Sequence, residues 1–206
     1  MIAYDVLILG SGLAGQSLAL RLADNLKVAL VTKRSLEDSA SAWAQGGIAS
    51  VLDPSDSAEA HIADTHTAGA GLCSDKTTRF VVENGPRAIR WLIDHGVPFT
   101  PDASSAVGYH LTREGGHSAR RIIHVADATG AAVQATLTEQ VRAHPNIAVY
   151  EQHIAVDLII GRKIGIRPMR HNDWTVICIL WAAVVGNSGV MKSPTLSAAT
   201  SPLKRL

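Results

Sequence analysis

The chain has 206 residues, 47% of them hydrophobic and 18% charged, so it can bury a substantial core and is not a disordered polymer. Its two cysteines are too few for a disulfide framework, which favours a reducing, cytoplasmic setting. The formal net charge of +1 argues against an electrostatic nucleic-acid binder. The charge is uneven, however, because residues 1–157 hold 12 basic and 17 acidic residues, whereas 158–206 hold 7 basic residues and one acid.

Neither a signal peptide nor a membrane span is expected. The N-terminal apolar run has Asp5 in front of it, no positively charged segment before it, and glycines within it. Residues 174–191 are 18 residues without a charge, close to the lower limit for crossing a bilayer. Only 176–185 is continuously apolar, so a buried strand or a non-native tail is the better interpretation.

The first elements in chain order are a strand, a turn, a helix and a second strand. Residues 4–9 and 28–31 have the apolar character of short buried strands, and 13–24 has helical spacing, with Leu18 and Leu22 on one face. Such a unit is typical of a parallel sheet with a right-handed crossover. We therefore predict an α/β fold built on a Rossmann-like parallel sheet with helices.

The rest of the chain predicts further helices and strands after a small-residue loop at 35–56, which we interpret as functional. The expected helices are 57–66, capped by Asp56 or Ser57, then 75–84, then 86–95 with Gly96 as its stop, and 129–143, ended by Pro145. The expected strands are 147–150 and 154–160.

Gly10, Gly12 and Gly15 form a G-x-G-x-x-G pattern between the first strand and the first helix. Gly10 allows a tight turn, Gly12 lets the backbone approach a pyrophosphate, and Gly15 lets helix and strand pack closely. The helix N-terminus then offers N–H groups and partial positive charge to phosphates. In this context the pattern predicts dinucleotide binding, with a purely structural turn as the alternative.

The acid expected at the end of the second strand is missing, and Lys33 and Arg34 stand there instead. A lysine cannot accept a hydrogen bond from a ribose hydroxyl, which argues against an ordinary NAD site. A solvated strand end is the alternative explanation of Lys33. A second glycine pair, in Ala44-Gln45-Gly46-Gly47, indicates backbone wrapped around an extended ligand, or else an ordinary loop.

Together, the strand–GSGLAG–helix unit, the AQGG loop and the segment HLTREGGHSARRIIHVADATG at 110–130 resemble the L-aspartate oxidase family. This family is related to the flavoprotein subunits of succinate dehydrogenase and fumarate reductase. The resemblance implies FAD-dependent oxidation of L-aspartate to iminoaspartate in bacterial NAD biosynthesis, with oxygen or fumarate as electron acceptor. It also implies hand-over of iminoaspartate to quinolinate synthase.

The resemblance assigns cofactor-binding residues by position. Gly10 and Gly15 shape the turn, Ser11, Gly12, Leu13 and Ala14 would meet the FAD phosphates, and Lys33 would lie near the adenosine end. The flavin would be lined by the segment Ala40, Ser41, Ala42, Trp43, Ala44, Gln45, Gly46 and Gly47. Ala40 stands where the respiratory relatives carry a histidine bonded covalently to the flavin, so any FAD is expected to be non-covalent.

Glu114, in TREGGH, is the candidate substrate-binding residue. A carboxylate beside two glycines can reach a ligand and is a natural partner for an ammonium group. By resemblance it would orient the amino group of aspartate, and the respiratory relatives lack this carboxylate. The alternative is a surface glutamate paired with Arg113 or Arg120.

The nine histidines and two cysteines form no metal-ligand spacing, so no metal site is expected. His110 and His117 flank the segment of Glu114 and either help to position it or are ordinary hydrogen-bonded loop histidines. Arg120 and Arg121 are too few for a nucleic-acid patch, and we expect them to be solvated or to cap a helix.

The resemblance fades after Gly165. We therefore expect an incomplete FAD-binding domain over 1–165 and a divergent tail over 166–206, either out of frame or belonging to a natural short paralogue. The polypeptide alone is then expected to have little or no activity, because the family's proton-transfer arginine has no counterpart in it. A succinate- or fumarate-type flavoprotein and a non-enzymatic FAD-binding remnant are the competing interpretations.

Overall fold

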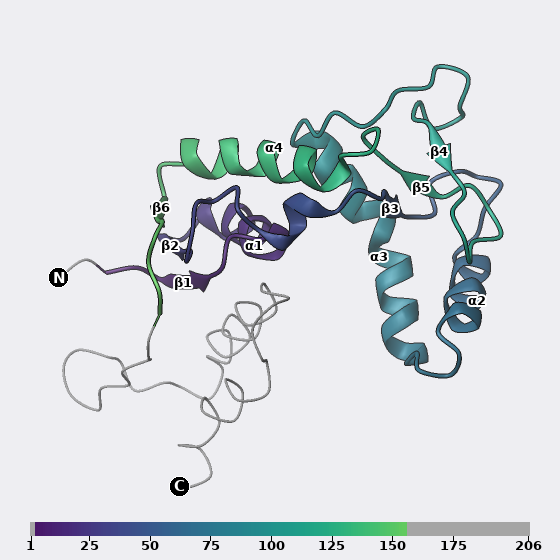
Figure 1. Ribbon diagram of the computed structural model, residues 1–206, viewed down its shortest axis with the longest axis horizontal. Coiled ribbons are helices and arrows are strands. Elements are labelled where there is room, and N and C mark those ends of the chain that lie inside the picture. The colour runs from purple at the N-terminus through teal and green to yellow at the C-terminus, as the bar shows by residue number, and fades with distance from the viewer. Residues whose placement is uncertain (1–2, 156–206) are drawn as a thin grey trace, which may run out of the picture. The chain divides into compact units, whose positions relative to one another are not determined.

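A computed structural model of the chain describes residues 3–155 (Figure 1). Its elements are β1 (Val6–Leu9), α1 (Leu13–Ala23), β2 (Val28–Val31), the 3-10 helix η1 (Ala40–Trp43), β3 (Ile48–Ala49), α2 (Ala58–Ala68), α3 (Asp75–Asp94), β4 (Leu111–Thr112), β5 (Ile122–Ile123), α4 (Thr129–Ala143) and β6 (Ile147–Tyr150). They divide into two compact units. Within the described part, unit 1 comprises 3–40 and 137–155, and unit 2 comprises 41–136.

Unit 1 is built on a parallel sheet of order β1-β2-β6. Val28 of β2 pairs with Val6 of β1 on one side and with Ile147 of β6 on the other. The predicted strand–helix–strand unit is confirmed, and so is the α/β class. The helix over 129–143 and the strand over 147–150 match α4 and β6 residue for residue.

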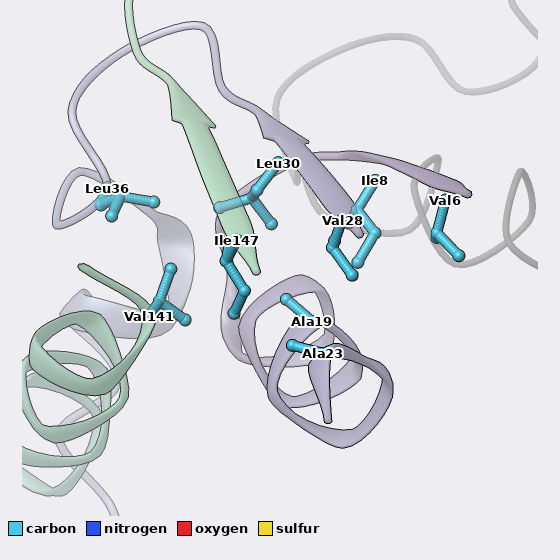
Figure 2. Packing of buried hydrophobic residues seen from close by; sticks show 9 residues of the cluster. All are labelled: Val6, Ile8, Ala19, Ala23, Val28, Leu30, Leu36, Val141 and Ile147. Carbon is cyan, nitrogen blue, oxygen red and sulfur yellow. The ribbon is translucent and has the colours of Figure 1, made fainter. Parts of the chain in front are cut away.

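The core of unit 1 lies between this sheet and helices α1 and α4 (Figure 2). Its buried members are Val6, Ile8, Ala19, Ala23, Val28, Leu30, Leu36, Val141 and Ile147. Ala19 and Ala23 are the buried members of α1 in this core, because small side chains let a helix approach a sheet closely, and Leu18 and Leu22 are partly buried and pack against it. Leu7 of β1 is 42% exposed, so the prediction that the first strand is buried throughout is wrong for this residue.

Unit 2 holds a small antiparallel sheet of order β3-β5-β4 with helices α2 and α3. Each of its strands has only two residues, too few to display an alternating pattern in the sequence. Ser57, one of the two predicted caps, accepts a hydrogen bond from the Ala60 backbone N–H (3.1 Å) and begins α2.

Helix α3 corrects the prediction of two separate helices over 75–84 and 86–95. It runs unbroken from Asp75 to Asp94 with Pro86 inside it. Proline lacks an N–H, so the carbonyl of Val82 does not receive the usual helical hydrogen bond. Gly96 follows the helix with φ +86°, which confirms it as the stop.

The described residues end before several predicted features. Ile154 and Ala155 are not in a strand, and the remainder of the strand expected over 154–160 lies outside the described residues. The segments 166–206 and 174–191 also lie outside them. Among the helices of the described part, none is long and apolar enough to cross a bilayer.

Candidate functional site

The first glycine of the fingerprint turns the chain sharply between β1 and α1. Gly10 has φ +112°, a conformation that L side chains rarely adopt, and its N–H donates to the carbonyl of Val31 (2.8 Å). A Cβ placed on Gly15 would lie 2.1 Å from the Gly10 carbonyl oxygen, so only glycine fits there. These are the turn and the close helix–strand packing that the pattern predicts.

Helix α1 begins at Gly12, which has extended backbone and no side-chain cap bond. The N-terminal turn therefore has no capping carboxylate or hydroxyl in front of it, and its backbone dipoles contribute partial positive charge there. This arrangement suits an anionic group such as a pyrophosphate. The residues fit the phosphate end of a dinucleotide cofactor.

A buried polar network beneath the fingerprint was missed in the sequence. The Ser11 hydroxyl bonds to the Thr32 hydroxyl at the end of β2 (2.8 Å), and the Gln16 side-chain amide donates to the Ser11 carbonyl (2.9 Å). Gln16 is fully buried and also bonds to the Thr138 hydroxyl (3.0 Å). A glutamine on the apolar face of α1 was the only available sign of it.

Lys33 is exposed just beyond the end of β2 and forms no ion pair with any described residue. Its neighbour Arg34 pairs instead with Asp38 (2.9 Å) at the surface. Lys33 is thus available to a ligand. The alternative, that it is only a solvated residue at the end of a strand, is also compatible with this geometry.

The segment predicted to line the flavin begins with η1. Ala40 is exposed, Trp43 is 79% exposed, and Ala44, Gln45 and Gly46 are exposed as well. Within unit 2, Gly130 at the start of α4 packs against this segment and donates its N–H to the Ala44 carbonyl (2.9 Å). A Cβ on Gly130 would lie 2.1 Å from the Ser41 carbonyl oxygen, so this contact depends on glycine.

The glycine pair places this segment beside Glu114. A Cβ on Gly47 would lie 2.5 Å from both Ile122 and Ile123, so only glycine lets the chain pass β5. At Gly46 a Cβ would lie 3.9 Å from a carboxylate oxygen of Glu114. Unit 2 therefore brings the AQGG segment and Glu114 together. Ser11–Ala14 and Lys33 belong to unit 1.

Glu114 is exposed, and its carboxylate forms no ion pair in the part of the chain that the structure describes. The alternative, pairing with Arg113 or Arg120, is not realised, because Arg120 donates instead to the Leu111 carbonyl (3.3 Å). The Glu114 backbone carbonyl accepts from the His117 N–H (3.2 Å). The carboxylate is left available to a cationic group.

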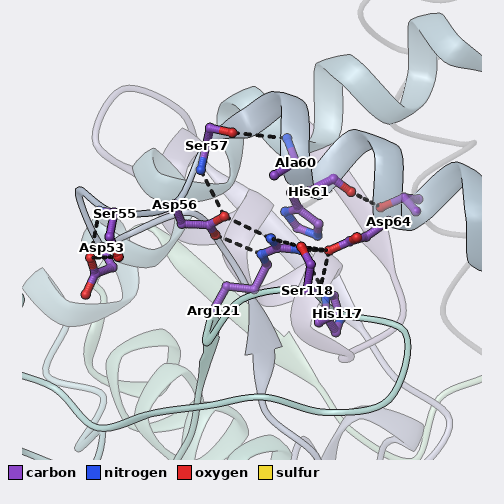
Figure 3. A network of polar contacts seen from close by, with 11 residues as sticks. Asp53, Ser55, Asp56, Ser57, Ala60, His61, Asp64, His117, Ser118 and Arg121 are labelled. Carbon is purple, nitrogen blue, oxygen red and sulfur yellow. Dashed lines mark hydrogen bonds and ion pairs between the residues drawn. The ribbon is translucent and has the colours of Figure 1, made fainter.

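Arg121 contradicts the expectation of a solvated arginine (Figure 3). It is completely buried and donates through two nitrogens to the two carboxylate oxygens of Asp56, both at 2.8 Å. It also bonds to Asp64, which in turn accepts from the N–H and hydroxyl of Ser118, both at 2.7 Å. Carboxylates 57 and 65 residues away are long-range partners that a lone Arg-Arg pair does not reveal.

The charges of this network are fixed by their surroundings. The Ser118 N–H and hydroxyl, and then Arg121, hold the pKa of Asp64 far below its ordinary value. For Asp56, burial is the largest single influence and opposes ionisation, but the hydrogen bonds from Arg121 and from the Ser57 N–H, together with the charge of Arg121, lower its pKa overall. Burial lowers the pKa of His61, and the neighbouring positive charge of Arg121 adds to this effect.

The histidines act as structural partners here. His110 and His124 are joined by a hydrogen bond (2.8 Å), which fits the interpretation of His110 as a hydrogen-bonded loop histidine. His117 contacts Arg121 (3.3 Å), and its ring centroid lies 5.5 Å from that of His61. Across the described residues, no group of His, Cys, Asp and Glu could hold a metal ion.

A parallel sheet entered through a glycine turn, followed by a helix whose N-terminus has no side-chain cap, is typical of a dinucleotide-binding domain. The chain matches the FAD-binding domain family over residues 5–195 and belongs to that family. The expected FAD cofactor is thereby confirmed, whereas the predicted domain boundary at residue 165 stays a prediction. The match continues past Gly165, where the resemblance was expected to fade.

The chain is 57% identical over 176 residues to L-aspartate oxidase 1 of Ralstonia nicotianae, covering 85% of this chain and 33% of that protein. It is 52% identical over 172 residues to the L-aspartate oxidase of Pseudomonas aeruginosa, covering 81% of this chain and 32% of that protein. The chain thus spans about a third of the length of these curated relatives.

Among solved structures, the fold is similar to a quinol fumarate reductase of E. coli. The TM-score is 0.71 with 29% identity, over 77% of this chain and 27% of that one. The resemblance to L-aspartate oxidases, and the relationship to fumarate reductase flavoproteins, are therefore both confirmed.

Proposed function

We propose that this chain is the FAD-binding part of an L-aspartate oxidase, which converts L-aspartate to iminoaspartate with non-covalent FAD. The observation that carries the proposal is the Glu114 carboxylate beside Gly46 of the AQGG segment, which has no ion-pair partner among the described residues. Oxidation removes a hydride from Cα and a proton from the amino group, and two electrons pass on to oxygen or fumarate. The names of the similar curated proteins support this assignment.

Residues of unit 1 would hold the phosphates of the cofactor. We assign this role to the backbone of Ser11, Gly12, Leu13 and Ala14 at the start of α1, in the turn shaped by Gly10 and Gly15. Lys33 would lie at the adenosine end, and the segment 40–47 would line the flavin. When bound, FAD accepts the hydride that leaves Cα of the substrate. Ala40 offers no nucleophile, which supports non-covalent binding.

Glu114 would bind the ammonium group of aspartate. An exposed carboxylate that has no cationic partner among the described residues can form a charge-assisted hydrogen bond to the ammonium group. Holding the amino group fixes which bond of Cα faces the acceptor. Succinate lacks an amino group and makes no such contact with Glu114, so this residue also favours the binding of an amino dicarboxylate over a dicarboxylate without an amino group.

We propose further that iminoaspartate passes to quinolinate synthase for NAD biosynthesis, in a cytoplasmic setting. The instability of an imine in water favours such direct use of the product. The cytoplasmic setting is supported by the low cysteine content.

Anaerobic addition of L-aspartate to the FAD-loaded chain tests the proposal. We expect the flavin absorbance to bleach slowly in a single turnover, and Glu114→Gln to slow this bleaching at least about tenfold further, since an ion pair is lost. Steady-state peroxide formation by this chain is expected to be low, because the arginine that transfers the proton in the family has no counterpart in it. Bleaching by succinate instead of aspartate would support the respiratory-type alternative, and failure of both would contradict an oxidase assignment.

A further inference from the structure

The segment that carries Glu114 has little to hold it locally. Gly115 and Gly116 follow Glu114 directly, Gly116 has φ +84°, and a Cβ on Gly115 would meet nothing within 4 Å. Glycines leave the backbone the largest conformational freedom. Before Glu114, strand β4 ends at Thr112, which pairs with Ile122 of β5, so the glycine side of the loop is the side that needs a separate attachment.

Asp64 of α2 supplies that attachment at Ser118 (Figure 3). It accepts from both the N–H and the hydroxyl of Ser118, 54 residues away in the chain. Its side chain is only 18% exposed, and the fully buried Arg121 is bonded to it. Arg121 is held in turn by both carboxylate oxygens of Asp56. Charge-assisted bonds of this kind are stronger than neutral ones and fix geometry.

The bonds between Asp64 and Ser118 lie close to Glu114 in the chain. The His117 N–H bonds back to the Glu114 carbonyl (3.2 Å), so the turn of Glu114–His117 begins where the bonds of Ser118 end. A flexible loop anchored immediately behind a binding carboxylate restricts where that carboxylate can lie. Among the described residues, the side-chain bonds of Asp64 go to Ser118 and Arg121, and none goes to the fingerprint or to the AQGG segment.

We propose that Asp64 is a positioning residue which, through Ser118, sets the preference of Glu114 for an amino dicarboxylate over a dicarboxylate without an amino group. The inference rests on the proposed function and deepens it. Loss of the attachment should weaken only the contact that Glu114 makes, because an ammonium ion needs the carboxylate in one place. Binding of a plain dicarboxylate should not change.

The test compares four variants of the FAD-loaded full chain by the change in flavin absorbance on rapid anaerobic mixing with L-aspartate or with succinate, recorded before the flavin bleaches. Asp64→Asn and Ser118→Ala probe the attachment. Asp102→Asn and Ser104→Ala are the matched controls, since Asp102 accepts from the N–H and hydroxyl of Ser104 in the same way (2.9 and 2.6 Å). Amide hydrogen exchange over 114–118 is measured in parallel.

We expect Asp64→Asn to raise the Kd for aspartate about fivefold or more, with the Kd for succinate unchanged, and to speed exchange over 114–118. Ser118→Ala keeps the backbone bond to Asp64. It should raise the Kd for aspartate by about half as much on a logarithmic scale, again with the Kd for succinate unchanged. The controls should change neither Kd. If Asp64→Asn fails to fold, the Ser118→Ala result decides.

Two outcomes overturn the inference alone. Equal losses for aspartate and succinate would show that Asp64 is merely structural, and unchanged aspartate binding would show that the attachment is irrelevant. If wild type does not bind aspartate, or Glu114→Gln binds it normally, the proposed function itself fails, and the inference with it.

Discussion

Arg121 and its neighbour Arg120 are the same type of residue, but the structure buries one and exposes the other. Arg121 is completely buried against Asp56 and Asp64, whereas Arg120 is exposed and reaches only a backbone carbonyl. What separates them is a pair of carboxylates from another part of the chain, a tertiary contact that local pattern does not encode. Glu114, by contrast, was proposed from its neighbouring glycines together with the family resemblance, both of which can be read locally in the sequence, and its role stays a prediction.

Removing the guanidinium tests how much this buried network stabilises the molecule. We expect Arg121→Met to lower the free energy of unfolding by about 3 kcal/mol, because two carboxylates lose their shared cation. Arg34→Met, which breaks the exposed pair with Asp38, is the control and should lower the free energy of unfolding far less, because solvent screens the charges of an exposed pair. Urea denaturation measures both, and similar losses in the two variants would contradict the prediction.

The lowered pKa of Asp64 predicts a loss of stability in acid. Its folded pKa lies below its unfolded pKa of about 3.9, so its contribution is complete above that value and is lost as the pH falls below it. The urea midpoint of wild type should therefore fall as the pH drops below about 4. In Asp64→Asn this fall should be shallower, whereas an unchanged pH profile would show that Asp64 contributes nothing.

At the scale of elements, the predictions hold where a pattern is long and regular. Helix α4 and strands β2 and β6 match residue for residue, since apolar spacing and the stop at Pro145 define them locally. The two-residue strands of unit 2 were not predicted, because they exist only through pairing. The boundary placed at Pro86 was wrong, since packing along a 20-residue helix outweighs one lost hydrogen bond.

Pro86 is therefore expected to weaken α3 rather than to serve it. Alanine is about 3 kcal/mol better than proline inside a helix, while proline restricts the unfolded chain by up to about 1 kcal/mol. Pro86→Ala should then stabilise the protein by about 2 kcal/mol, raising Tm by several degrees. Arg87→Ala, an exposed neighbour, serves as control. A lower Tm for Pro86→Ala would mean that Pro86 itself stabilises the folded protein.

At the scale of the whole molecule, binding of FAD should raise the thermal stability of the protein. A ligand that binds only the folded state adds about 2.7 kcal/mol at a hundred times its Kd. We expect FAD to raise Tm in wild type, and Gly15→Ala to abolish this shift, because its Cβ would overlap the Gly10 carbonyl. Ser17→Ala on the same helix is the control. Thermal scans with and without FAD decide, and an equal shift in Gly15→Ala would contradict the assignment of the turn.

The strand order β1-β2-β6 has a consequence for how the chain is made. About 115 residues separate β2 from β6, and all of unit 2 lies between them. At roughly 5–20 residues per second, a ribosome needs about 5 to 25 seconds to cross that interval. Until then the sheet is a two-stranded pair, marginal on its own, without the cover of Val141 and Ile147. The nascent chain therefore exposes the apolar faces of Val28 and Leu30 throughout the synthesis of unit 2, which makes this interval the period of greatest need for a chaperone.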